Sequence, residues 1–207
     1  SGQTRAKEEL QTPYMSKAVY IATTEPNSGK SIISLGLMQI LLGKTAKVGY
    51  FRPIIEDFEE DKIDNHIKTI LTHFEVDLKP TDAYAYTRSE VVKLKNQDKD
   101  DEIINHIIHK FKAIEDLFDF VLVEGSDFST EGNIIEWDTN VLIAKNLGIP
   151  AILITSGKDK MVEEAVSNLY MAYDSFKDKG VEVLMVVANK VAHDHRERLM
   201  TSLKNKV

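Results

Sequence analysis

Two kinds of apolar pattern alternate along the chain. Short runs are apolar at nearly every position, which is typical of strands buried on both faces of a sheet. They predict strands at 18–23, 48–51, 120–125, 151–155 and 181–190. We expect the second strand to end at Pro53, because proline has no N–H to donate to a sheet.

Longer stretches between these runs carry apolar residues three and four positions apart, the spacing of one helix face. They predict helices at 30–42, 61–74, 98–118, 138–146, 160–179 and 193–205. The first of these helices is apolar on nearly every side, so we expect it to be buried between layers of the fold.

Strands that alternate with helices of a dozen or more residues predict an α/β fold. We expect a doubly wound, mainly parallel sheet of the P-loop NTPase type, with helices on both faces and ligands beyond the carboxyl ends of the strands. We interpret residues 15–207 as one domain. Residues 1–14 are polar and lack periodicity, and we expect a cloning remnant or a disordered leader there, with Met15 as the natural start.

Composition narrows the classes of partner. Lys and Arg number 26 against 33 Asp and Glu, a formal net charge of −7. Nucleic-acid binders and membrane-surface modules use surplus cations to engage phosphates, so we expect neither kind of partner. The chain has no cysteine, which excludes disulfides and thiol chemistry. Residues 32–43, the longest apolar-rich run, fall far short of the roughly 20 residues that span a bilayer, and we expect a soluble cytoplasmic protein.

The candidate chemistry follows the first strand, where the loop TTEPNSGKS at 23–31 leads directly into a helix. A phosphate-binding loop needs converging backbone N–H groups, a helix amino end, a lysine for the terminal phosphates and a hydroxyl for magnesium. Gly29, Lys30 and Ser31 supply the second half of this pattern, whereas Thr24 stands where a standard loop has glycine. The alternative is a plain turn in which Asn27 or Ser28 caps the helix and Lys30 is exposed.

A second candidate is Glu124, the carboxylate at the end of the strand 120–125. An acid there, opposite a phosphate loop, commonly anchors magnesium or its water shell. The alternative is that Glu124 is a solvated acid in the first turn after the strand, without a role in a site. The histidines, which include His66, form no ligand cluster with other residues, and we interpret them as surface residues.

The order of these motifs resembles the dethiobiotin synthetase family of P-loop proteins. The motifs are the loop, FRPI at 51–54, VEG at 123–125 and NKV at 189–191. The stretch from VEGSDF to DTNVLIAKNLGIPAILITSG is similar to one branch, the N-terminal P-loop domain of long bacterial phosphate acetyltransferases. The resemblance covers about residues 15–191.

The resemblance implies ATP and Mg²⁺ as ligands. It places Thr24, Asn27, Gly29, Lys30 and Ser31 on the phosphate loop, and Ser28 lies within the same loop. It puts Arg52 where the synthetases have a lysine that stabilises the transferred phosphoryl group, and Asn189 where an asparagine contacts adenine. The magnesium-binding positions that follow from the loop and the resemblance are Ser31, Asp64 and Glu124.

In the acetyltransferase branch, the resemblance implies a regulatory domain. Acetyl transfer between acetyl-CoA and phosphate then takes place in a separate C-terminal domain of the same polypeptide, so these residues alone should not transfer acetyl groups. One alternative is a stand-alone ATP-dependent carboxylase of the dethiobiotin synthetase type. Another is an interaction domain that has lost nucleotide binding, because Thr23 replaces the family's glycine. A homo-oligomer stays open under each hypothesis.

Overall fold

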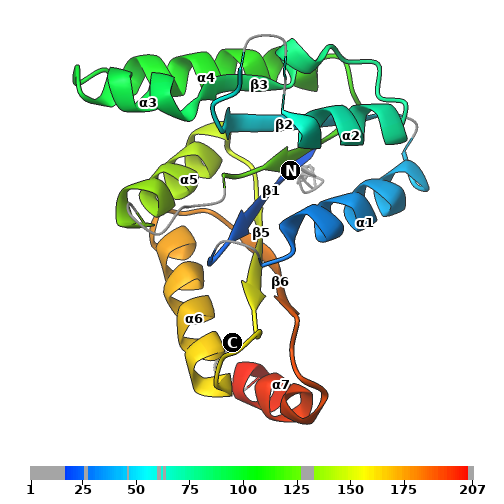
Figure 1. Ribbon diagram of the computed structural model, residues 1–207, viewed down its shortest axis with the longest axis vertical. Helices are drawn as coiled ribbons and strands as arrows, with labels where there is room; N and C mark the ends of the chain where they lie inside the picture. Colours follow the sequence, from blue (N-terminus) through cyan, green and yellow to red (C-terminus); the bar gives the residue numbers. More distant parts are fainter. Residues whose placement is uncertain are drawn as a thin grey trace, which may run out of the picture.

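A computed structural model describes residues 17–25, 28–45, 47–59, 62, 64–126 and 133–204. These residues form a six-stranded sheet in the order β3-β2-β4-β1-β5-β6, with every pair parallel (Figure 1). The strands are β1 (Ala18–Thr23), β2 (Val48–Ile55), β3 (Tyr84–Thr87), β4 (Phe120–Glu124), β5 (Ala151–Ser156) and β6 (Val183–Asn189). The predicted doubly wound sheet is confirmed.

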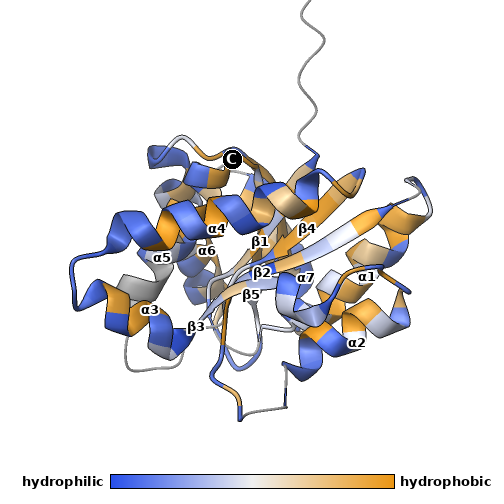
Figure 2. Ribbon diagram, turned by 90° about the horizontal axis from the view of Figure 1, so that it is seen from above, coloured by the Kyte–Doolittle hydropathy of each residue, from blue (hydrophilic) through white to orange (hydrophobic). Residues whose placement is uncertain are grey.

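Helices cover both faces of this sheet (Figure 2). The α-helices are α1 (Lys30–Leu42), α2 (Asn65–His73), α3 (Arg88–Lys95), α4 (Asp100–Glu115), α5 (Asn133–Leu147), α6 (Val162–Asp178) and α7 (Arg196–Lys204). Two short 3-10 turns, η1 (Pro80–Asp82) and η2 (His193–His195), complete the order. None of the described helices is both long enough and apolar enough to span a bilayer.

The two faces of the sheet have separate apolar cores. Side chains of α1 and α2 pack on one face, and those of α3 to α6 pack on the other. Connections that lead toward β3 use α1 and α2, and connections that lead toward β6 use α3 to α6. Right-handed crossovers produce this arrangement. Because all strands are parallel, β1, β2, β4 and β5 end at the same edge of the sheet. Their carboxyl ends converge where the sequence places its candidate chemistry.

The prediction that the second strand ends at Pro53 is wrong, because β2 continues to Ile55. β2 pairs with β4 only through Phe51, and it pairs with β3 at Arg52, Ile54 and Ile55. In a parallel strand, successive residues direct their backbone groups to opposite sides. The N–H of Arg52 points to β3, so the backbone of Pro53 faces the β4 side. Pairing with β4 has already stopped at Phe51, and the missing N–H of proline therefore costs the sheet no hydrogen bond.

The prediction that the helix at 30–42 is buried between layers is also wrong. On α1 only Lys30, Ser34 and Met38, a stripe four residues apart, are buried. Ile32 is 71% exposed and Ile40 is 58% exposed. Only one layer of helices covers this face of the sheet in the described structure, so the outward side of α1 has nothing to pack against.

The chain between 84 and 95 holds a strand and a helix that the apolar pattern did not predict. β3 has four residues, too few to show a period, and α3 has one buried side chain, Val91. A capping box could have revealed α3, because Thr87 accepts from the backbone N–H of Glu90 and the Glu90 side chain accepts from the N–H of Thr87.

Candidate functional site

The loop after β1 enters α1 through a glycine in the left-handed region. Gly29 has φ 90° and ψ 23° and occupies the N-cap position, and no side chain caps the helix. The amide groups of the first turn therefore lack the side-chain acceptor that usually satisfies them. Such a helix end favours an anion, through these N–H groups and the helix dipole.

Ser28 adds a second donor at this place. Its side chain is buried, and its Oγ has no hydrogen-bond partner among the described residues. A buried hydroxyl without a partner is costly, and a ligand that accepts its hydrogen bond would remove the cost. The alternative in which Ser28 caps α1 and Lys30 is exposed is wrong, since Ser28 makes no cap and Lys30 is 3% exposed. Asn27 lies outside the described residues.

Asn189, at the end of β6, holds the loop from the opposite side. Its Nδ2 donates to the carbonyl oxygen of Ser28 at 2.9 Å. A Cβ added at Gly29 would lie 2.2 Å from the same nitrogen, so this contact requires glycine. In the described structure the Asn189 amide thus supports the phosphate loop, and adenine contact by Asn189 stays a prediction.

The beginning of the loop is anchored to β5. The N–H of Thr24 donates to the Ile154 carbonyl at 2.9 Å, and its hydroxyl lies 3.0 Å from the hydroxyl of Thr155. The next residue, Glu25, accepts from the backbone N–H of Ser156 and pairs with Lys160. The described parts of the loop are therefore held by β5 through Thr24 and Glu25 and by β6 through Ser28.

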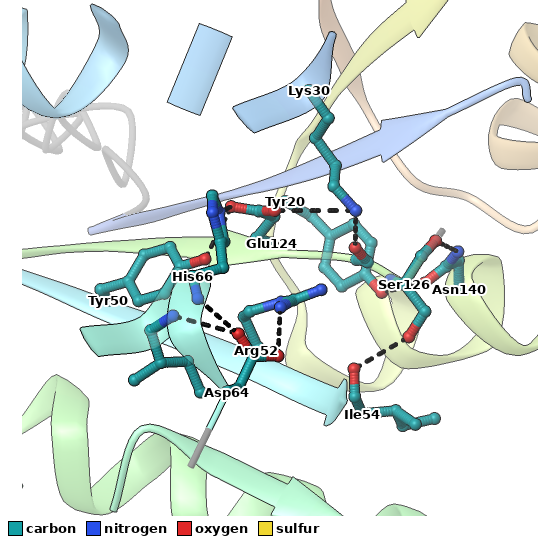
Figure 3. Close-up of polar contacts among 12 residues, drawn as sticks. Tyr20, Lys30, Tyr50, Arg52, Ile54, Asp64, His66, Glu124, Ser126 and Asn140 are labelled. Carbon is teal, nitrogen blue, oxygen red and sulfur yellow. Dashed lines mark hydrogen bonds and ion pairs between the residues drawn. The ribbon is translucent and has the colours of Figure 1, made fainter. Parts of the chain in front are cut away.

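Lys30 points its ammonium group to the end of β4 (Figure 3). Its Nζ donates to the Gly125 carbonyl at 2.6 Å and lies 3.6 Å from Oε1 of Glu124. Ser31, the next residue, is exposed at the start of α1. The predicted lysine and the predicted acid are thus brought together, and the interpretation of Glu124 as a solvated acid is wrong, since it is fully buried.

Two further side chains contact the Glu124 carboxylate. The Tyr50 hydroxyl donates to its Oε2 at 2.7 Å, and Nε2 of His66 lies 2.9 Å from the same oxygen. Oε1 accepts no hydrogen bond within the described chain. Burial by itself would raise the pKa of Glu124, but the hydrogen bond from His66 and the charges of Lys30 and Arg52 hold it well below its usual range. Glu124 is therefore a buried carboxylate that stays ionised.

Arg52 and Asp64 form the neighbouring pair. A guanidinium nitrogen of Arg52 donates to Oδ2 of Asp64 at 2.6 Å. The other carboxylate oxygen, Oδ1, accepts from the backbone N–H groups of His66 and Ile67 and so caps α2. This cap explains why α2 begins at Asn65 and not at residue 61, as the apolar spacing predicted.

Near the ammonium group of Lys30 lies a set of hydrogen-bonded polar side chains that the sequence did not single out (Figure 3). Tyr20 donates to Oδ1 of Asn140, and Ser126 Oγ donates to the Ile54 carbonyl at 3.0 Å. A Cβ on Gly125 would lie 2.8 Å from Asn140 Oδ1 and 2.8 Å from the ring of Tyr20. Glycine at position 125 therefore lets the backbone approach Asn140 and Tyr20 closely. The carbonyl group of this glycine accepts the hydrogen bond from Lys30.

Sequence reasoning missed Tyr50 and assigned His66 to the surface. His66 is instead partly buried, with 22% of its side chain exposed, and it contacts Glu124. Tyr50 lies two positions before Arg52 on β2, on the same face of the strand, and that alternation was the available signal. Nothing local marks His66, because its partner lies 58 positions away.

The donor set fits a nucleotide with a divalent cation. The uncapped helix end, the unpartnered Ser28 hydroxyl and Lys30 suit phosphate oxygens. Oε1 of Glu124, which accepts no hydrogen bond in the described chain, suits a cation or its water. Among the described residues, no group of three or more His, Asp or Glu side chains could hold a metal ion by itself. The predicted magnesium positions Ser31, Asp64 and Glu124 thus stay a prediction.

Comparison with known proteins gives relatives over almost the whole chain. A family model described as an AAA domain matches residues 17–206. A phosphate acetyltransferase of Nitratidesulfovibrio vulgaris is 38% identical over 195 residues, which are 93% of this chain and 28% of that protein. A phosphate acetyltransferase of Synechocystis is 32% identical over 192 residues, 93% of this chain and 28% of that protein. The chain thus spans little more than a quarter of these relatives.

Solved structures of low sequence identity share the fold of this chain, and the similarity extends to the fold alone. A GTPase from Pyrococcus abyssi in apo form superposes with a TM-score of 0.53 at 17% identity, over 87% of this chain and 71% of that one. The kinase domain of the Escherichia coli tyrosine kinase ETK gives 0.52 at 14% identity, over 86% and 68%.

Proposed function

Because the chain belongs to the AAA domain family, we propose that it binds ATP through the loop that leads into α1. The observation that carries this proposal is the buried Ser28 hydroxyl without a partner, beside Gly29 and the uncapped amino end of α1. A phosphate group there would accept from the hydroxyl and from the first amides of the helix.

Lys30 and the acids around it would complete the site. The Lys30 ammonium group would move from Glu124 toward the terminal phosphates, where it supplies a point charge. Ser31, Asp64 and Glu124 would hold Mg²⁺, which neutralises phosphate charge when bound. Thr24 and Asn27 lie on the same loop, Arg52 would face the terminal phosphate, and Asn189 would keep the loop in register.

For the whole protein, the relatives support a phosphate acetyltransferase in which residues 15–207 form the N-terminal P-loop domain. The transfer of acetyl groups between acetyl-CoA and phosphate would take place in a C-terminal domain of the same polypeptide. The role of this domain would be regulatory, with ATP as effector, in the cytoplasm. A homo-oligomer is compatible with this proposal.

Calorimetric titration of ATP with Mg²⁺ tests the nucleotide site. We expect binding to the wild type and a loss of at least about tenfold in affinity for Lys30→Met, which keeps the length of the side chain but removes its charge. Lys112→Met, on the exposed side of α4, is the matched control and should bind like the wild type. Absence of binding to the wild type at millimolar ATP would refute the assignment.

The regulatory role needs the protein expressed from the full natural gene. We expect ATP to change the rate of acetyl phosphate formation in the wild type and to leave the rate of Lys30→Met unchanged. A rate that is insensitive to ATP in both proteins would leave nucleotide binding intact and remove the regulatory role.

The stand-alone carboxylase is the weaker candidate, because Arg52 replaces the expected lysine and is paired with Asp64. A carboxylase would release ADP only in the presence of both diaminopelargonate and bicarbonate. We expect no such dependence.

A further inference from the structure

The two acids of the candidate site, Asp64 and Glu124, differ in how their oxygens are used. Both oxygens of Asp64 already accept hydrogen bonds, Oδ2 from Arg52 at 2.6 Å and Oδ1 from the backbone N–H groups that begin α2. In Glu124 only Oε2 accepts, and Oε1 accepts no hydrogen bond within the described chain. Glu124 is therefore the acid with an oxygen available to a ligand.

Two donors meet on the same oxygen of Glu124. The Tyr50 hydroxyl lies 2.7 Å from Oε2, and Nε2 of His66 lies 2.9 Å from it. Because an ionised carboxylate can only accept hydrogen bonds, Nε2 of His66 carries the hydrogen. The two oxygens of a carboxylate are chemically equivalent, so the donors fix the orientation of the group. With Oε2 held in this way, Oε1 faces the ammonium group of Lys30 at 3.6 Å (Figure 3).

Both donors are themselves held in place. Tyr50 is fully buried on β2, which pairs with β4 at the position of Leu122, two residues before the acid. His66 is the second residue of α2, and its backbone N–H donates to Oδ1 of Asp64 at 2.8 Å. The rings of Tyr50 and His66 meet edge to face, with centroids 6.1 Å apart. Donors on such fixed elements can orient the carboxylate that accepts from them.

A role in stability alone does not account for this pattern. A buried carboxylate is usually satisfied at both oxygens, because an unpaired buried polar atom is costly. Here both donors are spent on one oxygen, and the nearby ammonium group of Lys30 lies beyond hydrogen-bond distance of the other. Lys30 donates to the Gly125 carbonyl at 2.6 Å instead. The arrangement thus keeps Oε1 of Glu124 open toward the phosphate loop, at a cost to the protein.

We propose that His66 and Tyr50 are positioning residues for the cation site, which hold Oε2 of Glu124 so that Oε1 is directed to the divalent cation of a bound nucleotide. The inference rests on the proposed ATP site and extends it to two side chains that act through Glu124. Mg²⁺ in nucleotide sites is held by one or two carboxylates together with phosphates and waters. Since no group of three or more acids or histidines in the described chain could hold a metal ion by itself, the orientation of a single carboxylate oxygen matters.

Calorimetric titration of ATP, once with Mg²⁺ and once with EDTA, separates this role from a structural one. In the wild type we expect Mg²⁺ to strengthen ATP binding. His66→Leu should lose at least about tenfold of that strengthening, the usual cost of removing the partner of a metal ligand. In EDTA it should bind ATP nearly as the wild type does. Lys30→Met should instead bind ATP more weakly under both conditions, because it removes a charge that contacts phosphate.

Three further variants complete the test. The side-chain nitrogen of glutamine is as many bonds from Cα as Nε2 of histidine, so His66→Gln can donate to Oε2 and should regain most of the Mg²⁺ effect. Tyr50→Phe removes the second donor and keeps the ring in the core. It should reduce the Mg²⁺ effect in the same direction, and it tests the same carboxylate if His66→Leu is too unstable to purify. His73→Leu, at the exposed end of α2, is the matched control and should keep the full effect.

A Mg²⁺ effect in both His66→Leu and Tyr50→Phe equal to that of the wild type would overturn the inference and leave the ATP site intact. A loss in His66→Gln as large as that in His66→Leu would also overturn it, because the hydrogen-bond donor would then be irrelevant. So would a wild type that binds ATP equally with Mg²⁺ and with EDTA. If the wild type binds no ATP at millimolar concentration, the proposed function itself fails, and this inference fails with it.

Discussion

The ammonium nitrogen of Lys30 lies 3.6 Å from Oε1 of Glu124, and both residues are almost wholly buried, at 3% and 0% exposure. In this state the phosphate-loop lysine is neutralised within the protein. A polyphosphate would have to draw Lys30 away from Glu124, and the carboxylate would then need another cation. This exchange of partners links the stability of the site to its ligand.

Glu124→Gln removes the counter-charge of Lys30 and nearly preserves shape. We expect the variant to lose about 3 kcal/mol of unfolding free energy, because breaking a buried ion pair leaves one charge uncompensated. Urea denaturation measures this loss. Glu115→Gln, which breaks the exposed pair with Lys112, is the control and should change stability by less than about 1 kcal/mol. Equal losses in the two variants would mean that the buried ion pair contributes no more to stability than the exposed pair does.

The pH dependence of stability follows from the depressed pKa of Glu124. Burial would raise this pKa, but the His66 hydrogen bond and the Lys30 charge outweigh burial. The unfolded chain has the ordinary value of about 4.3. The contribution of Glu124 is therefore fully present above that pH and is lost as the pH falls below it. We expect the urea midpoint to fall more steeply from pH 5 to pH 3 in the wild type than in Glu124→Gln. Parallel profiles would contradict the assigned pKa.

The elements that the sequence predicted well are those with a strong local signal. β1 and α1 begin and end where their patterns do, because a run of buried residues and a glycine-lysine boundary fix them. Glu124 could be identified because it closes an apolar strand. β3 and α3 escaped prediction, since both bury few side chains and owe their place to α4 and β2.

The partners of Glu124 could not be predicted, for a different reason. Tyr50 and His66 reach the carboxylate only after β2 and β4 pair and α2 packs beside them. The outward face of α1 fails in the opposite sense, because its apolar sequence predicts burial, whereas Ile32 and Ile40 are exposed in the described chain. Local patterns report how much apolar surface a segment carries, and they do not report what buries it.

Asn189→Ala should weaken the phosphate loop. The variant removes the donor to the Ser28 carbonyl, a bond worth about 1 kcal/mol, and frees the loop beside Gly29. We expect ATP affinity to fall about fivefold, measured by calorimetry. Asn146→Ala is the matched control, because Asn146 donates to the Leu142 carbonyl at 2.8 Å on the exposed side of α5. If the two variants bind ATP equally, Asn189 does not support the site.

Substitutions of Asp64 can separate its two contacts. Asp64→Asn keeps an oxygen that caps α2 but loses the ion pair with Arg52, whereas Asp64→Ala loses both. We expect Asp64→Ala to lower the unfolding free energy by about 1 kcal/mol more than Asp64→Asn does, the usual value of an N-cap. Both should weaken Mg²⁺-dependent ATP binding if Asp64 contributes to the magnesium site. Binding equal to that of the wild type in Asp64→Asn would remove Asp64 from the site.

Gly29→Ala tests the geometry of the loop against a glycine of similar conformation elsewhere. Gly29 has φ +90° and Gly180 has φ +78°, so alanine at either position carries the strain of the left-handed region, about 1 kcal/mol. Nothing lies within 4 Å of a Cβ at Gly180, whereas a Cβ at Gly29 would lie 2.2 Å from Nδ2 of Asn189. We therefore expect Gly180→Ala to bind ATP normally with a slightly lower urea midpoint. Gly29→Ala should lose more stability and most of its ATP affinity.

The double variant Gly29→Ala/Asn189→Ala should regain part of that stability, since the clashing amide is gone. If it regains none, the contact between the two residues does not account for the effect of the alanine.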